Sequence, residues 1–269
     1  MNLSARLKAL AFVCALLLPG CSSPPGETGG VPVHRPRIID VRSHRATVFT
    51  QGLEAYQDRV YESGGGYGSS TISILDLSDY RVSLTVSLPD SVFAEGLTLL
   101  DGVGYLLTWR EGTAYTFDPE SLRILSRLPL ETEGWGICEY RGNLLTSDGS
   151  NVIRVRNPES FLPVDSFQVT VSGRPQGGLN ELESVGRFVL ANRYRSDRIL
   201  VIDPSTGEVV LILDCSALLD RRRFPRAGVL NGTALLPDST GLLVTGKNWP
   251  YSFTVGLEWL ERLNPRGQD

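Results

Sequence analysis

Histidine is scarce in this sequence, and its scarcity excludes two kinds of catalytic site. The 269 residues contain two histidines, His34 and His44, and both precede the repeated part of the chain. A Ser-His-Asp triad needs a histidine beside its nucleophile, and a histidine-rich zinc site needs several histidines. We therefore expect neither kind of site in the repeated region.

Cysteine is scarce as well. Of the four cysteines, Cys138 and Cys215 lie in the repeated region, each in an apolar segment and neither at CxxC spacing. This pattern argues against a metal or redox site. The sequence leaves two states open for the pair, a disulfide of an exported protein and two separate buried thiols.

Long apolar runs are missing after the first twenty residues. Residues 9–18 are apolar, follow the basic Arg6 and Lys8, and are too short to span a bilayer, which is typical of an export signal. The run ends at Leu18-Pro19-Gly20-Cys21, which resembles a bacterial lipobox, so we expect Cys21 to carry a lipid. Ordinary secretory cleavage nearby is the alternative.

This N-terminal pattern predicts three regions and a location. We expect a lipoprotein signal peptide at residues 1–20, a flexible tether at 21–36, and one domain over 37–263. Ser22 after the cysteine resembles the sorting signal of outer-membrane lipoproteins, which predicts an exported protein of the cell envelope on the outer membrane, facing the periplasm. Its contact with the membrane would be the lipid anchor alone.

An excess of positive charge is also missing. The chain has 26 basic and 30 acidic residues, for a formal net charge of −4. A mildly acidic chain has no electrostatic footprint for nucleic acid, so we expect no nucleic-acid partner. The basic run Arg221-Arg222-Arg223, with Arg226 nearby, is interpreted as a solvated loop.

Strand and turn patterns, in contrast, are abundant. With 28 glycines and 16 prolines, the chain reads as short segments of alternating apolar and polar residues separated by turns such as Asp101-Gly102. Five strand-like segments begin at similar polar side chains, 38 to 51 residues apart: Gln51, Glu95, Glu133, Asn180 and Asn231. About four strands per repeat predict an all-β fold, a five-bladed β-propeller whose ring residues 37–42 would close.

A propeller would gather these five side chains at one mouth of its channel, because the innermost strands line that channel. The residues at the ends of the second strands should lie beside them: Trp109, Asp148, Tyr194 and Lys247. For Glu133 a structural alternative stays open, in which its carboxylate accepts hydrogen bonds from backbone N–H groups at a strand end. Asp148 and Ser150 also have a structural interpretation, which we favour, as residues that form a turn.

Nine motifs in chain order carry a family resemblance. They are Phe49-Thr50-Gln51-Gly52-Leu53, Tyr61-Glu62-Ser63-Gly64, Glu95-Gly96, Leu107-Thr108-Trp109, Glu133-Gly134-Trp135-Gly136, Ser147-Asp148-Gly149-Ser150, Asn180-Glu181-Leu182-Glu183, Leu230-Asn231-Gly232 and Thr245-Gly246-Lys247-Asn248-Trp249-Pro250. Over roughly residues 37–257 the chain resembles the plant and bacterial type of glutamine cyclotransferase, or glutaminyl-peptide cyclotransferase, a family of five-bladed propellers. The resemblance implies that the N-terminal glutamine of a peptide or protein is cyclised to pyroglutamate with release of ammonia.

The resemblance also implies roles for single residues. Glu95 aligns with the family's glutamate at the channel mouth and is the expected proton shuttle, with Asn180 and Lys247 completing the catalytic group. The expected substrate-binding residues are Phe49, Gln51, Trp109, Trp135 and Tyr194. Two positions depart from the family pattern, since Tyr194 stands where tryptophan is usual and Ala94 where glycine is commoner.

We expect the reaction to need no cofactor, although the sequence allows a structural divalent cation in the channel. We also expect a monomer. Two other functions stay open: a non-catalytic envelope propeller that binds a peptide or protein partner, and a metal-dependent propeller hydrolase of the lactonase kind. The hydrolase would need several acids or histidines around a metal, whereas the predicted ring holds mostly amides and aromatic side chains.

Overall fold

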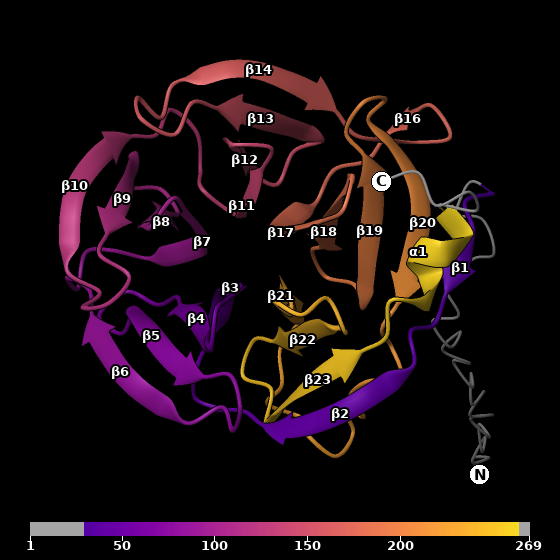
Figure 1. Ribbon diagram of the computed structural model, residues 1–269, viewed down its shortest axis with the longest axis horizontal. Helices are drawn as coiled ribbons and strands as arrows, with labels where there is room; N and C mark the ends of the chain where they lie inside the picture. Colours follow the sequence, from indigo (N-terminus) through magenta and orange to yellow (C-terminus); the bar gives the residue numbers. More distant parts are fainter. Residues whose placement is uncertain (1–29, 264–269) are drawn as a thin grey trace, which may run out of the picture.

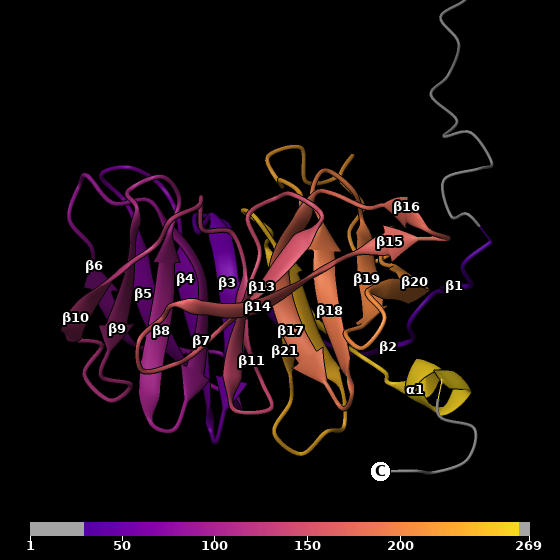
Figure 2. The same cartoon turned by 90° about the horizontal axis from the view of Figure 1, so that it is seen from above.

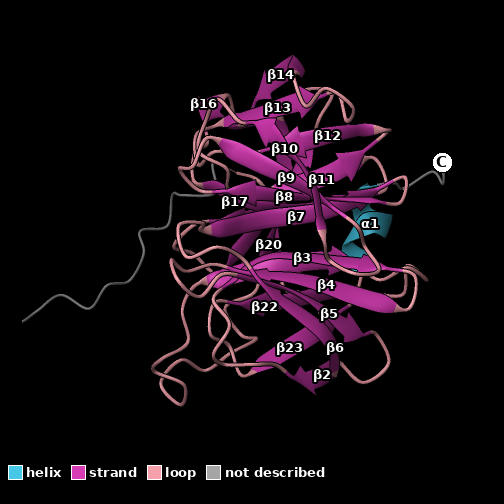
Figure 3. Cartoon of the chain, turned by 90° about the vertical axis from the view of Figure 1, so that its left-hand side faces the viewer, coloured by secondary structure: helices cyan, strands magenta, loops and turns pink. Residues whose placement is uncertain are grey.

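The computed structural model describes residues 30–263, and strands make up almost all of its regular structure (Figure 3). Within this range the strands form five sheets, four with four strands and one with seven. The sheets stand next to one another around a central axis (Figures 1 and 2). The fold is therefore an all-β propeller, as the sequence repeat predicted.

Three of the four-stranded blades consist of consecutive strands that run from the axis outward (Figure 1). The first blade has β3 (Thr50–Tyr56), β4 (Arg59–Gly64), β5 (Thr71–Asp76) and β6 (Val82–Ser87). The second has β7 (Ala94–Leu100), β8 (Val103–Thr108), β9 (Thr113–Phe117) and β10 (Ile124–Pro129). The third has β11 (Ile137–Tyr140), β12 (Asn143–Thr146), β13 (Val152–Arg156) and β14 (Pro163–Gln168).

The remaining four-stranded blade closes the ring. It contains β21 (Leu230–Leu235), β22 (Leu242–Gly246), β23 (Tyr251–Val255) and β2 (Ile38–Ser43). β2 comes from the start of the domain and pairs antiparallel with β23, with Val41 opposite Phe253. The prediction that residues 37–42 would supply the closing strand is confirmed.

The seven-stranded sheet has the same inner order and an enlarged outer edge. Its inner part is β17 (Leu179–Val185), β18 (Phe188–Arg193), β19 (Arg198–Asp203) and β20 (Glu208–Asp214). The short strands β15 (Thr170–Val171), β16 (Arg174–Pro175) and β1 (Val33–His34) extend it. The repeat did not predict this extension.

The strand β1 corrects part of the predicted tether. Val33 and His34 pair in parallel with β20, and the Pro32 carbonyl accepts a hydrogen bond of 2.9 Å from the Ile212 N–H. A flexible tether is therefore wrong for residues 32–34, which belong to the fold. The signal peptide predicted at 1–20, the lipidation site Cys21 and the rest of the tether up to residue 29 lie outside the described residues.

The hairpin turns show why the predicted dipeptides suit this fold. Asp101 and Gly102 both have positive φ, at 50° and 73°, between β7 and β8. Arg141 and Gly142 do the same between β11 and β12, at 51° and 77°. Two successive residues with positive φ match the turn type whose twist fits antiparallel strands.

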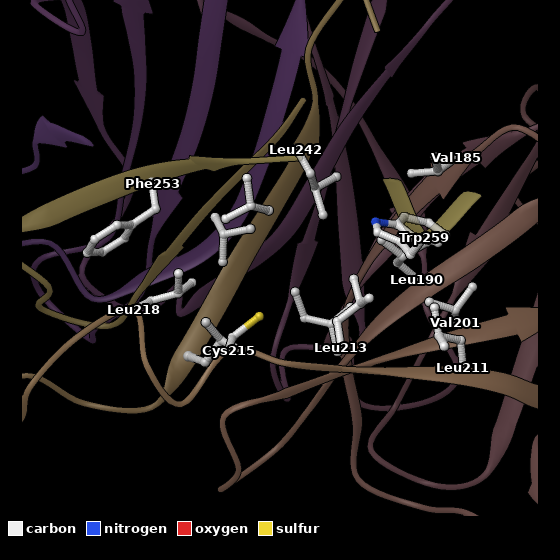
Figure 4. Packing of buried hydrophobic residues seen from close by; sticks show 14 of the residues in the cluster. Val185, Leu190, Val201, Leu211, Leu213, Cys215, Leu218, Leu242, Phe253 and Trp259 are labelled. Atoms are coloured by element: carbon white, nitrogen blue, oxygen red, sulfur yellow. The ribbon is translucent and has the colours of Figure 1, made fainter. Parts of the chain in front are cut away.

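A large apolar cluster packs between the seven-stranded sheet and the closing blade (Figure 4). It includes Trp249 and Trp259, which are 1% and 0% exposed. Trp259 belongs to α1 (Glu258–Leu263), a helix that the sequence pattern did not predict and that lies at the outer edge near β1 and β20 (Figures 1 and 2). No helix in the described part of the chain is long and apolar enough to cross a membrane.

Cys138 and Cys215 are both buried and both carry free thiols. They belong to different apolar clusters, and burial raises the pKa of each thiol above its usual value. Of the two states left open by the sequence, the structure has the separate thiols. A buried thiol that holds its proton is a small apolar side chain and not a nucleophile.

Candidate active site

Side chains from the inner strands of the five sheets, or from the segments that adjoin those strands, meet in one cavity of about 200 Å³. Its lining consists of Phe49, Gln51, Phe93, Glu95, Trp109, Trp135, Asn180, Tyr194 and Lys247. The eight side chains predicted for the catalytic and substrate-binding groups are all in this set. The ninth, Phe93, was not predicted as a site residue.

The polar side chains of the cavity sit at irregularities in the innermost hairpins. The register between β7 and β8 shifts between Ala94 and Leu97, and this interval contains Glu95. The β3–β4 pairing shifts at Gln51, and the β17–β18 pairing shifts at Asn180. A bulge turns a side chain out of the normal alternation of a strand, and bulges are common beside active sites. The β21–β22 pairing shifts in the same way at Asn231. In three of these four hairpins the polar residue at the shift lines the cavity.

Glycines beside these residues let neighbouring blades approach closely. A Cβ on Gly96 would lie 2.8 Å from the Trp135 carbonyl oxygen, and one on Gly136 would lie 2.1 Å from the Asn180 carbonyl oxygen. Hydrogen bonds cross the same gaps, from Gly96 N–H to Trp135 O at 2.8 Å and from Ser147 Oγ to Asn180 O at 2.7 Å. The backbone of one site residue is thus fixed by the next blade.

These contacts correct the register of the third repeat. Gly136 occupies the place in its blade that the glycines after Gln51 and Glu95 occupy in theirs, because each faces the backbone of the following blade in the same way. The residue equivalent to Gln51 and Glu95 is therefore Trp135. The prediction that Glu133 takes this ring position was wrong by two residues.

Aromatic rings form most of the cavity wall. Phe93 contacts Phe49 edge-on, with ring centroids 6.3 Å apart, and lies 5.5 Å from Trp109. On the other side Trp135 meets Tyr194 edge-on at 5.2 Å. Phe93 could have been found from the sequence, because it precedes Glu95 by two residues as Phe49 precedes Gln51.

Glu133 connects two tryptophans of this wall through hydrogen bonds. Its Oε2 atom accepts hydrogen bonds of 3.0 Å from the indole N–H groups of both Trp109 and Trp135. Its Oε1 atom accepts a bond of 2.8 Å from Arg110 Nε, and the Arg110 guanidinium lies 3.8 Å from the centroid of the Trp109 ring. Glu133 therefore orients two tryptophans, which is neither the ring position nor the backbone role considered for it.

Lys247 and Glu95 both line the cavity, and each can carry a charge at neutral pH. Both side chains are nearly buried, with Lys247 6% and Glu95 5% exposed. The Lys247 Nζ lies 4.6 Å from the Phe49 ring centroid and 5.7 Å from that of Tyr194, so it closes the wall between these rings. Burial lowers the pKa of Lys247 to about 8, against the opposing effect of Glu95. Burial raises the pKa of Glu95 well above its usual value; Lys247 opposes this rise, while Glu111 and Glu133 add to it.

Two other predicted members of the ring do not line the cavity. Asn231 is fully buried, and its Nδ2 donates hydrogen bonds to the carbonyl oxygens of Thr50 and Gln51, at 3.1 and 3.0 Å. It supports the strand that carries Gln51. Asp148 accepts a hydrogen bond of 2.6 Å from Arg154 and one from the Ser150 N–H in its own turn, so it has the turn-forming role that the sequence favoured for it.

The innermost strands carry a set of buried acids that the sequence reasoning did not single out. Burial raises the pKa of Glu54 to about 7, and it raises those of Glu181 and Glu183 well above the usual value. Among residues 30–263, however, no group of three or more His, Cys, Asp or Glu side chains is arranged to hold a metal ion. The channel cation that the sequence allows, held by acids or backbone carbonyls, stays a prediction.

Known proteins resemble this chain over most of its length. The family model described as glutamine cyclotransferase matches residues 11–257. The glutaminyl-peptide cyclotransferase of Arabidopsis thaliana is 34% identical over 236 residues, which are 84% of this chain and 73% of the plant protein. The crystal structure of Myxococcus xanthus glutaminyl cyclase, also 34% identical, has a TM-score of 0.77 and covers 84% of this chain and 97% of that one. This chain therefore belongs to the glutamine cyclotransferase family.

Proposed function

We propose that this chain is a glutaminyl-peptide cyclotransferase, which converts the N-terminal glutamine of peptides or proteins to pyroglutamate and releases ammonia. The observation that carries the proposal is Glu95, a buried carboxyl group with a raised pKa in a cavity walled by aromatic rings. Membership of the family supports the same activity and does not favour a non-catalytic propeller or a metal-dependent hydrolase.

The reaction forms one C–N bond and breaks another. The α-amino nitrogen of the substrate attacks its own side-chain amide carbon, and the bond from that carbon to the amide nitrogen then breaks. Starting from the neutral amine, one proton must move from the attacking nitrogen to the leaving nitrogen, which departs as ammonia. Glu95 carries this proton, first as a base and then as an acid.

The surroundings of Glu95 suit both halves of the transfer. An ordinary glutamate is a weak base at neutral pH and holds an abstracted proton poorly. Burial raises the pKa of Glu95 well above its usual value, so the carboxyl group can accept a proton and return it. The aromatic wall keeps water from the reacting atoms, which strengthens every charge interaction inside.

Asn180, Gln51 and Lys247 hold the substrate's polar atoms. The Asn180 Oδ1 atom is buried and has no hydrogen-bond partner among the described residues, so it offers an acceptor to an N–H group of the substrate. Gln51 lines the same cavity and can bind the amide. Lys247 stabilises the negative charge that develops on the carbonyl oxygen during attack.

Ammonia release from defined peptides tests the proposal. The purified full chain is expected to release ammonia from Gln-Ala-Ala amide. N-acetyl-Gln-Ala-Ala amide, which lacks a free amine, and Asn-Ala-Ala amide, whose shorter side chain cannot form the five-membered ring, should release none. We propose that no cofactor is needed, so release should survive a chelator. Absence of release from any glutamine peptide would refute the function, and loss with chelator would point to metal-dependent chemistry.

Replacing Glu133 with glutamine should disturb the tryptophan wall. Glu133→Gln removes the negative charge that holds both indole N–H groups, and such charge-assisted bonds contribute about 1.5–3 kcal/mol. We expect kcat/KM for Gln-Ala-Ala amide to fall about tenfold, mainly through KM, with a shift in tryptophan fluorescence. Glu120→Gln, whose carboxylate binds Arg59 at the surface, is the control. Unchanged fluorescence and kinetics would show that the indoles do not need Glu133.

We also propose that the propeller is best counted as five-bladed. The seven-stranded sheet contributes β17 to β20 in the same inner-to-outer order as the four-stranded blades. The short strands β1, β15 and β16 are then additions to its rim. The site supports this count, because Asn180 and Tyr194 come from this sheet and complete the cavity.

We further propose that the protein is an exported lipoprotein anchored at Cys21, on the outer membrane facing the periplasm, and that it acts as a monomer. The support for the anchor is the lipobox-like sequence that ends at Cys21. Cys21→Ser should move the protein from the membrane to the soluble fraction of cells. Unchanged membrane association would overturn the lipid anchor, and a larger mass by light scattering would overturn the monomer.

A further inference from the structure

A second, polar cleft of about 630 Å³ adjoins the catalytic cavity. It is lined by Arg193, Tyr194, Arg195, Ser196, Asp197, Arg198, Asp214 and Ser216, from the turn between β18 and β19 and from the end of β20. Tyr194 lines both the cavity and the cleft. The cleft therefore lies directly beside the cavity, so a peptide bound there by its first residue can extend into it.

The cleft is lined by charges of both signs, and Arg195 is the exposed basic side chain next to Tyr194 at its rim. It contains three arginines and two aspartates, and each aspartate is paired with a further arginine: Asp197 with Arg221, and Asp214 with Arg35 at 2.9 Å. The carboxylates of both aspartates are therefore neutralised by arginines. One of the added arginines comes from the basic run at 221–223, which the sequence alone indicated as a solvated loop.

Arg195 lines the cleft next to Tyr194, the residue that the cleft shares with the cavity. Its guanidinium is 5.3 Å from the centroid of the Tyr194 ring, and its side chain is exposed. Arg195 has φ of 60°, a conformation that is uncommon for a residue other than glycine. An exposed guanidinium held beside an aromatic ring is suited to binding a carboxylate through two parallel hydrogen bonds.

We propose that this cleft binds the substrate residues that follow the N-terminal glutamine, and that it selects peptides with acidic side chains there. The inference rests on the proposed function, because it takes the cavity as the site of the first residue. Charge complementarity of this kind improves encounter and binding but leaves the chemistry unchanged, so it should appear in KM more than in kcat.

Three peptides that differ at the second residue test the inference: Gln-Glu-Ala-Ala amide, Gln-Ala-Ala-Ala amide and Gln-Lys-Ala-Ala amide. The C-terminal amide leaves the second side chain as the variable charge. At low salt the wild-type chain should prefer the glutamate peptide to the lysine peptide by about three- to tenfold in kcat/KM. The preference should shrink at high salt, because exposed charges are screened.

Arg195→Glu should abolish or reverse this preference while leaving kcat for the alanine peptide unchanged. Arg81→Glu makes the same charge change at the outer turn between β5 and β6, on another blade, and should keep the wild-type preference. Equal kcat/KM for the glutamate and lysine peptides in the wild type would overturn the cleft proposal. Absence of ammonia from all three peptides would instead refute the proposed function, so the two failures are distinguishable.

Discussion

Glu95→Gln should lower kcat for ammonia release by roughly 10²–10⁴-fold, which corresponds to about 3–5 kcal/mol of transition-state stabilisation. The amide has nearly the size of the carboxyl group it replaces but cannot carry a proton between the two nitrogens. Glu95 is 5% exposed, so bulk water cannot readily take over the transfer. Steady-state and single-turnover ammonia release from Gln-Ala-Ala amide would measure the loss.

The pH dependence of ammonia release tests whether Glu95 is the group that carries the proton. Glu95 must be ionised to take the first proton, and its pKa is raised above that of an ordinary glutamate. The substrate amine must also be neutral, so kcat/KM of the wild type should rise with pH through both groups, and Glu95→Gln should keep only the rise due to the amine. Lys247, whose pKa is about 8, should give an alkaline fall when it loses its charge. Glu111 and Glu133 also act on Glu95, so these apparent values belong to the coupled group.

Two outcomes would decide against Glu95 as the proton shuttle. One is near-normal turnover in Glu95→Gln, and the other is a variant whose acid limb is as steep as that of the wild type and has the same midpoint. Glu120→Gln, a surface change on the outer side of its blade, should retain both the rate and the profile. Folding of each variant can be compared by circular dichroism, so that a misfolded protein is not mistaken for an inactive one.

Gly136→Ala should cost about 3 kcal/mol of unfolding free energy, the upper part of the range for overpacking a core. The added Cβ would lie 2.1 Å from the Asn180 carbonyl oxygen and 2.7 Å from the Glu181 Cα. Both are backbone atoms, so no side chain can rotate away, and the third blade must shift from the seven-stranded sheet. Chemical denaturation would measure the loss, and activity should fall because Trp135 and Asn180 line the cavity.

Gly177→Ala is the matched control for this prediction. A Cβ at that position would come no closer than 3.6 Å to another atom, which is ordinary van der Waals contact, and Gly177 does not have a positive φ. Its unfolding free energy should stay close to that of the wild type. If Gly136→Ala were equally stable, close backbone contact at Gly136 would not be what sets the spacing of these blades.

Much of the architecture followed from the sequence because it depends on local chemistry. Dipeptides such as Asp101-Gly102 specify tight hairpins, and the repeat of a polar residue at the start of a strand pattern specifies the blades. The predictions that were wrong concerned features that depend on contacts between blades. The segment Glu133-Gly134-Trp135-Gly136 offers two glycines two residues apart, and only the approach of Gly136 to the next blade shows which one sets the register.

The sequence allowed the residues that line the cavity to be predicted, but not the role of Glu133, which binds the two tryptophans of its wall. Residues such as Glu95 and Asn180 occupy repeated positions, so the fold alone brings them together. The role of Glu133 depends on the directions of two indole N–H bonds, which no sequence pattern encodes. The strand β1 and the helix α1 were missed for a related reason, since both are short and gain their stability from docking on an existing sheet.

The pairing of β2 with β23 makes the order of synthesis matter. These strands are among the first and the last parts of the domain to be made, and they lie roughly two hundred residues apart. Contacts across such a distance in the chain are slow to form, because the entropy of closing the loop must be overcome first. The blades can form one by one as the chain emerges, yet the ring, and with it the alignment of the cavity, becomes complete only when the final strand finds the early one.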